Sequence, residues 1–259
     1  MYKHLIKIEC LTGLHVGSGD INFNIIDKEV ERDPVTGRPI IHASGVKGAF
    51  RDAYKAAGGN DMKRIFGSEG NNSDYTTGEY KFLGAELLTR PLRAYGTGLA
   101  SIPVTTIDTI NAYLRVLNGF GCNHYGIETI NHKPSEKILS PDGRVIVEGE
   151  ETEKMSDELA MNLDKLSDIL PEGTAIIRDF DDYPLPVMAR NCIDNGKSVN
   201  LWYEEYVPQT SVFYTLILTD DKDLDEAIGV GGVVQFGGHY SIGYGFTRLK
   251  EIGYLGRIV

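Results

Sequence analysis

Hydrophobic and polar residues alternate along the first segment of the chain, and a second segment near its end is almost wholly apolar. In residues 2–11, Ile6, Ile8 and Cys10 fall on one side of an extended backbone. Residues 211–219 are rich in β-branched and aromatic side chains. Period-two alternation and apolar β-branched runs are typical of β-strands. We therefore predict a strand in each segment.

Helical periodicity appears in the first third of the chain. Val46, Phe50 and Tyr54 recur every four residues and define one face of a helix. Ser44 is a residue type favoured at helix N-caps, and the two glycines at 58–59 are typical of a helix end. We predict a helix between these two signals.

Two further helices are predicted from isoleucines and leucines that recur at intervals of three and four residues. One lies within residues 106–121, and the other runs from a Ser156 cap to the residue before Pro171. Their apolar positions are Ile107, Ile110, Leu114 and Leu117 in the first, and Leu159, Leu163, Leu166 and Leu170 in the second.

Turn signals divide the last third of the chain into strands. Residues 185–205 have the form of a long hairpin, because Asp-Asn-Gly at 194–196 tolerates positive φ at the turn. Residues 232–238 and 245–253 are predicted to be two final strands around a glycine loop. The irregular alternation of strands and helices predicts an α+β fold with an antiparallel sheet.

Length and composition allow one large domain or two small ones. The chain has 259 residues, of which 41% are hydrophobic. It lacks the apolar run of roughly 20 residues that crosses a bilayer, and its polar N-terminus does not resemble a signal peptide. We therefore expect a soluble, cytoplasmic protein. Cys10, Cys122 and Cys192 contain no C-x-x-C pair, which argues against a disulfide framework and a zinc site and predicts buried or half-buried thiols.

The net charge of −11 argues on its own against nucleic acid as a ligand. The charges are, however, unevenly distributed. Residues 1–70 carry 10 basic and 9 acidic side chains, whereas residues 137–182 carry 5 basic and 13 acidic ones. The N-terminal third is therefore free to present a local positive surface.

The first candidate site combines a glycine-rich loop with the start of the first predicted helix. Gly17 allows close approach of a ligand to the backbone, and Ser44, Lys47 and Arg51 supply donors at the helix N-terminus. Cations oppose the helix dipole there, unless an external anion such as phosphate is bound. The alternative is a capped surface helix with solvated cations. The spacings of a P-loop and of a dinucleotide fingerprint are both absent.

The second candidate site is the glycine loop within residues 234–249. Its glycines alternate with His239, Tyr240 and Tyr244, a combination suited to a sugar-phosphate backbone or an unstacked base. The alternative is a tight hairpin whose glycines serve only the geometry of the turn.

Taken together, these motifs resemble the RAMP superfamily of CRISPR proteins. The resemblance covers residues 5–55, 185–219 and 228–250, and the segment Leu185–Pro208 is most similar to the backbone subunit of type III-B (Cmr) effector complexes. Residues 201–208 favour this type over the related type III-A. The resemblance implies one domain over residues 1–259.

The same resemblance implies an RRM-like ferredoxin palm with insertions. One insertion, at residues 183–208, is a thumb β-hairpin that wedges into the guide–target duplex. Independently of the resemblance, the polar and turn-rich composition within residues 60–80 predicts a flexible loop. The implied partners are the guide CRISPR RNA, a complementary target RNA, other copies of the chain in a filament and other Cmr subunits, with no membrane. The residues implied to bind RNA are His15, Gly17, Ser44, Lys47, Arg51, Gly238 and His239.

The family resemblance also implies a catalytic aspartate, which corresponds to Asp27. Its carboxylate would hold Mg²⁺ or a similar divalent cation and assist attack of the target's 2′-hydroxyl on the adjacent phosphate. Asp20 is the competing candidate. In the structural alternative, Asp27 only pairs with Arg32 or Arg38.

Three functions therefore stay open. The leading one is a guide-binding filament subunit that cleaves target RNA. The second is a purely structural RNA-binding subunit. The third is a stand-alone, metal-independent endoribonuclease that processes guide RNA with His15 or His42 as general base.

Overall fold

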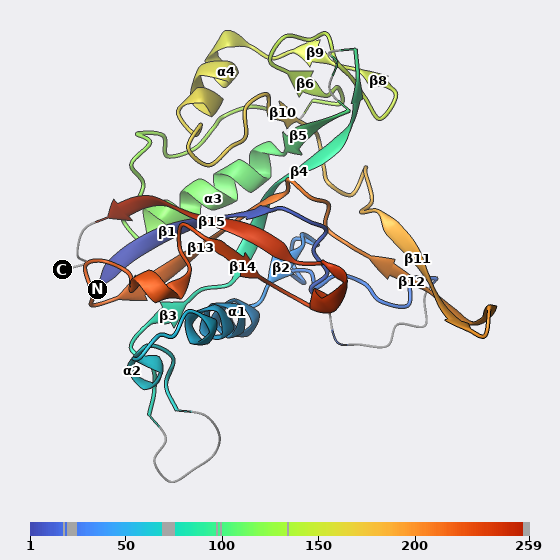
Figure 1. Ribbon diagram of the computed structural model, residues 1–259. Coiled ribbons are helices and arrows are strands. Elements are labelled where there is room, and N and C mark those ends of the chain that lie inside the picture. The colour runs from blue at the N-terminus through green and yellow to red at the C-terminus, as the bar shows by residue number, and fades with distance from the viewer. Residues whose placement is uncertain are drawn as a thin grey trace.

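The computed structural model describes residues 1–17, 19, 25–68, 76–96, 98, 100–133 and 135–255. Its central sheet is mainly antiparallel (Figure 1). The middle of this sheet has the order β15-β1-β13-β4, with β14 at the edge beside β15. These strands are β1 (Tyr2–Cys10), β4 (Ala85–Tyr95), β13 (Val212–Thr219), β14 (Val233–Gln235) and β15 (Phe246–Leu255).

The order of these strands defines a ferredoxin-like palm. If β1, β4, β13 and β15 are numbered one to four in chain order, their order across the sheet is 4-1-3-2. The helices α1 (Ala43–Ala56) and η1 (Glu226–Ile228) make the two crossovers and contact each other. The predicted α+β fold with an RRM-like palm is confirmed.

One face of the sheet packs on α1. Ile6 and Ile8 of β1 lie in the same buried cluster as Val46 and Phe50 of α1 and Ile228 of η1. The alternation predicted for the first strand and the apolar stripe of the first helix therefore meet in one core. Burial of such side chains contributes about 1.5–3 kcal/mol each.

The opposite face packs on α3 (Ile107–Gly119), which belongs to a long insertion between β4 and β13. Leu5 of β1 and Leu216 of β13 join Ile110 and Leu114 of α3 in a second buried cluster. Figure 1 shows α1 and α3 on opposite sides of the sheet. Every residue of β13 is buried, because this central strand is covered on both faces.

The remaining elements of the insertion extend the sheet past β4, or lie above it (Figure 1). Two of its strand pairs, β10–β5 and β6–β9, are parallel. The elements are β5 (Ser101–Thr105), β6 (Leu139–Ser140), β7 (Ile146–Val147), β8 (Glu150–Glu151), β9 (Glu153–Lys154), α4 (Asp157–Asp164) and β10 (Ala175–Ile176). The short strands β2 (Ile40–Ile41) and β3 (Lys81–Phe82) pair with β4 and β13, and η2 (Tyr240–Ile242) lies in the C-terminal glycine loop.

The predicted hairpin is formed by β11 (Val187–Asp194) and β12 (Lys197–Glu205), which pair only with each other among the described strands. It projects away from the sheet (Figure 1). Asn195 and Gly196 both have positive φ, 47° and 77°, as the Asp-Asn-Gly turn predicts. Cys192, expected to be at least half-buried, is exposed on β11.

Two predicted helix boundaries are wrong. The first helix begins at Ala43 with His42 as N-cap, so Ser44 lies inside the first turn and caps nothing. The cause is that β2 ends at Ile41, where it pairs with Ala85, and the chain turns into the helix directly. Sequence alone does not show where a two-residue strand ends.

The third predicted helix is shorter than its leucine pattern. Ser156 caps α4 as predicted, by accepting a hydrogen bond from the Leu159 N–H at 3.2 Å. The helix ends at Asp164, and the following residues form turns in which Leu166 and Ile169 bond three residues back. Leu166 and Leu170 are still buried. Apolar spacing therefore predicts their burial correctly and their helical state wrongly.

Within residues 60–80, where we predict a flexible loop, α2 (Met62–Phe66) buries Ile65 and Phe66. Arg64 forms ion pairs with Asp61, Glu79 and Asp221. Residues 69–75 lie outside the described part of the chain. Among the described helices, none is long and apolar enough to cross a membrane.

Candidate nucleic-acid interface

Two glycine-rich loops from opposite ends of the chain lie against each other. The N–H of Gly238 donates to the His15 carbonyl at 2.9 Å, and the N–H of Gly245 donates to the Gly13 carbonyl at 2.8 Å. Gly237 has a φ of 74°, and a Cβ on it would lie 2.4 Å from the His15 oxygen. Only glycine permits this approach. The fold thus joins the two predicted RNA-binding loops into what we call the two-loop surface.

His15 is buried within the two-loop surface. Its Nδ1 lies 2.7 Å from the Glu205 carbonyl oxygen, so Nδ1 is the donor of this hydrogen bond. A Cβ on Gly17 would lie 3.0 Å from the His15 Nε2. Gly17 therefore keeps the space beside the His15 ring open.

His239 lies beside His15, with ring centroids 5.3 Å apart. Its backbone is left-handed, with a φ of 62°, and its Nε2 lies 3.2 Å from the Glu204 carboxylate. Burial lowers the pKa of His239, and the Glu204 charge partly opposes this effect. The structure therefore brings together four of the predicted RNA-binding residues: His15, Gly17, Gly238 and His239.

Glu204 connects this surface to the base of the hairpin. Its side chain is only 4% exposed, and its Oε1 accepts hydrogen bonds from Lys28 Nζ at 2.8 Å and Trp202 Nε1 at 2.7 Å. Its Oε2 lies 2.5 Å from Arg190 Nε and 3.2 Å from His239 Nε2. Burial alone would raise the pKa of Glu204, but Lys28, Trp202 and His239 outweigh it and lower the pKa to about 2. Glu204 is thus an ionised group that joins three segments.

The neighbouring Glu205 fixes the segment that follows Asp27. Its Oε2 accepts a hydrogen bond from the Val30 N–H at 3.1 Å, and its Oε1 pairs with Arg32 at 2.5 Å. The Glu205 N–H in turn donates to the Lys28 carbonyl at 2.9 Å. Residues 28–32 are therefore held against the end of β12.

Asp27 lies exposed at this junction. Its Oδ2 accepts a hydrogen bond from the Tyr203 N–H at 2.8 Å, and its own N–H donates to the Tyr203 carbonyl at 3.1 Å. These two bonds orient the carboxylate at the base of the hairpin. The other oxygen, Oδ1, has no hydrogen-bond partner among the described residues.

Among the described residues, Asp27 does not form the ion pair with Arg32 or Arg38 that its structural alternative requires. Arg32 pairs with Glu205, and Arg38 donates to the hydroxyl of Thr109 at 3.0 Å. Neither arginine contacts Asp27. The competing candidate Asp20 lies outside the described residues.

The N-terminus of α1 lacks the usual compensation for its dipole. His42 makes no side-chain cap bond, and the first turn contains no acidic residue. By contrast, α3 and α4 each have a side-chain cap and acidic residues in their first turn. Ser44 is exposed, whereas Lys47 and Arg51 are partly buried, and Lys47 forms no ion pair within the described residues. The helix therefore presents unpaired N–H groups together with basic side chains.

Two contacts attach α1 to the rest of the interface. Phe50 packs edge-on against Phe236, the residue directly before the C-terminal glycine loop, with centroids 6.0 Å apart. His42 Nε2 lies 3.0 Å from the Glu31 carboxylate, in the segment that follows Asp27. The α1 N-terminus and the two-loop surface thus share one side of the palm.

A buried arginine holds the chain that leads into the hairpin. Arg90 of β4 is 2% exposed, and it donates to the carbonyls of Phe180 at 2.9 Å and of Tyr183. Its guanidinium lies 5.3 Å from the centroid of the Phe180 ring. Burial lowers the pKa of Arg90 to about 10. This one side chain fixes the backbone just before the first hairpin strand.

The described residues offer a divalent cation only part of a coordination shell. They contain no group of three or more His, Cys, Asp or Glu side chains placed to hold a metal ion. The open Oδ1 of Asp27 is one hard oxygen ligand. Such a donor suits Mg²⁺ only when phosphate oxygens of a bound nucleic acid and water complete the shell.

Glu204, Lys28, Arg190 and Trp202 are residues of this site that the sequence analysis missed. A glutamate at the end of a strand is ordinarily solvated, and nothing local shows that it is buried among cations. The one available signal was Glu-Glu directly after the apolar and aromatic residues Leu201, Trp202 and Tyr203 of β12. Because side chains alternate between the two sides of a strand, either Glu204 or Glu205 is expected to point toward the protein interior.

The palm, its hairpin insertion and the two glycine loops define a RAMP-type fold. The chain belongs to the RAMP superfamily, which matches residues 7–248. Along 97% of its length it is 27% identical to the CRISPR system Cmr endoribonuclease Cmr4 of Pyrococcus furiosus, of which 97% is covered. The expected resemblance to type III-B Cmr proteins is confirmed.

Two solved structures have the same fold. One is a type III-B Cmr-beta complex bound to cognate target RNA, with a TM-score of 0.74 and 21% identity over 97% of this chain and 98% of that one. The other is oligomeric Cmr4 from Pyrococcus furiosus, with a TM-score of 0.71 and 21% identity over 99% and 100%.

Proposed function

We propose that this chain is a guide-RNA-binding subunit of a Cmr-type complex that forms a filament and cleaves the paired target RNA at regular intervals. The observation that carries the proposal is the position of Asp27. It lies at the base of the hairpin, and the Glu204 cluster joins its segment to the two-loop surface. The name of the Pyrococcus furiosus relative, an endoribonuclease, supports the same activity.

Guide phosphates would bind the N-terminal turns of α1 and the two-loop surface. The uncapped helix, Ser44, Lys47 and Arg51 offer donors and positive charge to a run of phosphates. The loop at Gly238 and His239 lies against His15 and would close on the same strand. Base specificity is not expected, because pairing with the guide reads sequence while the protein contacts the backbone.

The hairpin would act as a wedge in the guide–target duplex. By register, Val187, Leu201 and Tyr203 lie on one face of the two-stranded hairpin, and all three are exposed. An apolar face on a projecting hairpin can separate adjacent base steps. A nucleotide displaced there would lie next to Asp27.

Cleavage would use the target's own 2′-hydroxyl. A 2′-O–P bond forms, the P–O5′ bond breaks, and the products are a 2′,3′-cyclic phosphate and a 5′-hydroxyl. Oδ1 of Asp27 would take the proton from the 2′-hydroxyl, since Oδ2 is held by the Tyr203 N–H. Water would protonate the leaving 5′-oxygen. The wedge would supply the in-line geometry that this attack requires.

We expect cleavage to depend on a divalent cation, which Asp27 and RNA phosphate oxygens would hold and which would stabilise charge on the phosphate. Other copies of this chain and other Cmr subunits are the proposed protein partners. The oligomeric Pyrococcus furiosus structure supports self-association.

The test is cleavage of a labelled RNA by the complex assembled with guide RNA and its partner subunits, in Mg²⁺ and in EDTA. A labelled RNA of equal length without complementarity is the control. Regular cuts that EDTA abolishes support the proposal. Cuts that survive EDTA favour the metal-independent endoribonuclease, and binding without any cut favours the structural subunit.

A further inference from the structure

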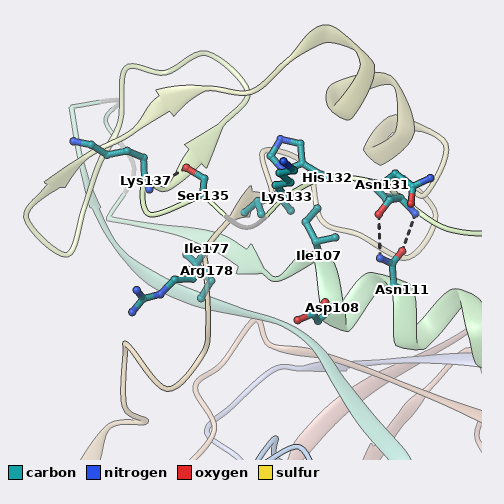
Figure 2. A pocket seen from close by; sticks show the side chains of 12 residues that line it. Ile107, Asp108, Asn111, Asn131, His132, Lys133, Ser135, Lys137, Ile177 and Arg178 are labelled. Atoms are coloured by element: carbon teal, nitrogen blue, oxygen red, sulfur yellow. Dashed lines mark hydrogen bonds between the residues drawn. The ribbon is translucent and has the colours of Figure 1, made fainter.

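A second basic site lies on the opposite face of the sheet from α1. It is a cavity of about 510 Å³ between the N-terminal turn of α3, residues 130–133 with Ser135 and Lys137, and the end of β10. We call it the α3–β10 pocket. Figure 2 shows Lys137 and Arg178 on one side of this pocket and His132 and Lys133 on the other.

The floor of the α3–β10 pocket is apolar. Ile107, Ile130, Ile176 and Ile177 line it, and each is at most 8% exposed. Asn111 strengthens this floor, because its amide bonds both the N–H and the carbonyl of Ile130, at 2.8 and 3.0 Å. A rigid apolar floor suits a flat ring rather than a hydrated ion.

The rim of the pocket is basic although its surroundings are acidic. Lys133 and Lys137 form no ion pair within the described residues, and Arg178 is paired with Asp182 at 2.6 Å. Asp108 is the single acidic residue in the lining. Residues 137–182 carry 13 acidic side chains against 5 basic ones, so unpaired lysines at one cavity mark a local preference for an anion.

His132 supplies a further polar atom without a partner. Its Nδ1 is buried and has no hydrogen-bond partner among the described residues. A buried ring nitrogen of this kind is costly unless a ligand or water pairs with it. Asp108 offers a carboxylate that can accept hydrogen bonds from ribose hydroxyls.

We propose that the α3–β10 pocket binds a nucleotide, with its base on the isoleucine floor and its phosphate near Lys133 and His132, while Lys137 on the opposite side of the pocket adds positive charge. Either a free mononucleotide or one nucleotide of a bound RNA has this chemistry. The volume lies within the range of small-molecule sites. The proposal goes beyond the proposed function, because α1 and the two-loop surface take no part in it.

The test uses fluorescently labelled AMP and a labelled eight-nucleotide single-stranded RNA as probes, each titrated with the whole protein. The variant Lys133→Glu/Lys137→Glu is compared with Lys165→Glu, which changes an exposed lysine outside the pocket. We expect the double variant to weaken binding at least tenfold and Lys165→Glu to leave it unchanged. Hydrogen exchange within residues 130–137 and 176–178 should slow when AMP is added.

The two probes distinguish the sources of the nucleotide. Tenfold weaker AMP binding supports a free-nucleotide site. RNA binding that weakens in the double variant and also in Lys47→Glu, with AMP not binding at all, supports a site for one nucleotide of RNA. If neither probe distinguishes the double variant from the wild type, and both unfold at the same temperature, the proposal is wrong. If the double variant loses binding of a protein partner but binds both probes as the wild type does, the proposal is also wrong.

Discussion

Glu204 makes the proposed interface sensitive to acid. Its carboxylate is buried among Lys28, Arg190 and His239 and has a pKa of about 2 rather than 4.5. Between pH 4.5 and pH 2, the Glu204 carboxylate becomes protonated in the unfolded chain but stays ionised in the folded chain. The free energy of unfolding therefore falls as the pH falls through this window.

For the wild type we expect this loss to be about 1–3 kcal/mol between pH 4.5 and pH 2. Glu204→Gln removes the titrating group, so the variant should be less stable at pH 7 and lose less on acidification. Urea denaturation at a series of pH values measures both. Identical pH slopes for variant and wild type would show that Glu204 does not titrate as described.

Lys47 tests the proposed phosphate contacts at the α1 N-terminus. Lys47→Ala should weaken guide-RNA binding several-fold for any sequence and lower the slope of log affinity against log salt by about 1. Lys165→Ala is the matched control. Filter binding between 50 and 200 mM salt measures the slope. An unchanged slope would mean that Lys47 touches no phosphate.

At the scale of elements, Arg90 decides how firmly the hairpin is anchored. It lies buried under residues 180–184 and donates to several carbonyls there. Lysine offers a single point charge without the planar fork of donors. Arg90→Lys should therefore leave carbonyls unpaired and cost about 2–4 kcal/mol of stability.

Arg93→Lys, on the same strand, is the matched control, because Arg93 is 73% exposed and, among the described residues, pairs only with Glu148. It should change stability by less than about 1 kcal/mol. Urea denaturation gives the two free energies, and limited proteolysis should cut Arg90→Lys faster near residues 180–190. If the two substitutions reduce stability equally, Arg90 does not anchor the hairpin.

Strands β1, β13 and β15 and the hairpin were predictable because their signals are local, whereas the palm strand β4 was not predicted. The Asp-Asn-Gly turn sets the hairpin register, and alternation in β1 matches its two buried faces. The end of α4 was not predictable, since Leu166 and Leu170 stay buried after the helix has ended. The start of α1 depends on where β2 pairs with β4, which is a tertiary contact.

The sequence motifs of the candidate site were predictable, but the contacts between them were not. Glycine loops at both ends of the chain pointed to a ligand, and the structure joins them through Gly238 and His15. The Glu204 cluster brings together residues 28, 190, 202 and 239, which are far apart in sequence. No local pattern reports such a cluster, because each member alone resembles an ordinary surface residue.

At the scale of the whole molecule, charge separates two regions. The acidic excess lies in residues 137–182, within the insertion, whereas α1 and the two-loop surface lie on the palm. Outside the α3–β10 pocket, the acidic side chains of the insertion repel RNA and favour the palm as its main binding surface. The net charge of −11 is therefore compatible with a protein that binds RNA on one side.

The most direct test of this account is a comparison of wild type, Asp27→Ala and Asp27→Asn, each assembled with guide RNA and partner subunits. Asp27→Asn keeps an acceptor for the Tyr203 N–H, so it removes charge with the least change in structure. Asp164→Ala, at an exposed aspartate of α4, is the matched control. Cuts in a labelled complementary RNA are mapped in Mg²⁺, and target binding is measured in parallel.

We predict that both Asp27 variants bind target as the wild type does and lose the regularly spaced cuts by at least a hundredfold in rate, on the order of the contribution of a positioned acid–base group. The control should cut normally. Regular cuts that persist in Asp27→Asn and Asp27→Ala would contradict the account and leave Asp27 a structural residue of its loop.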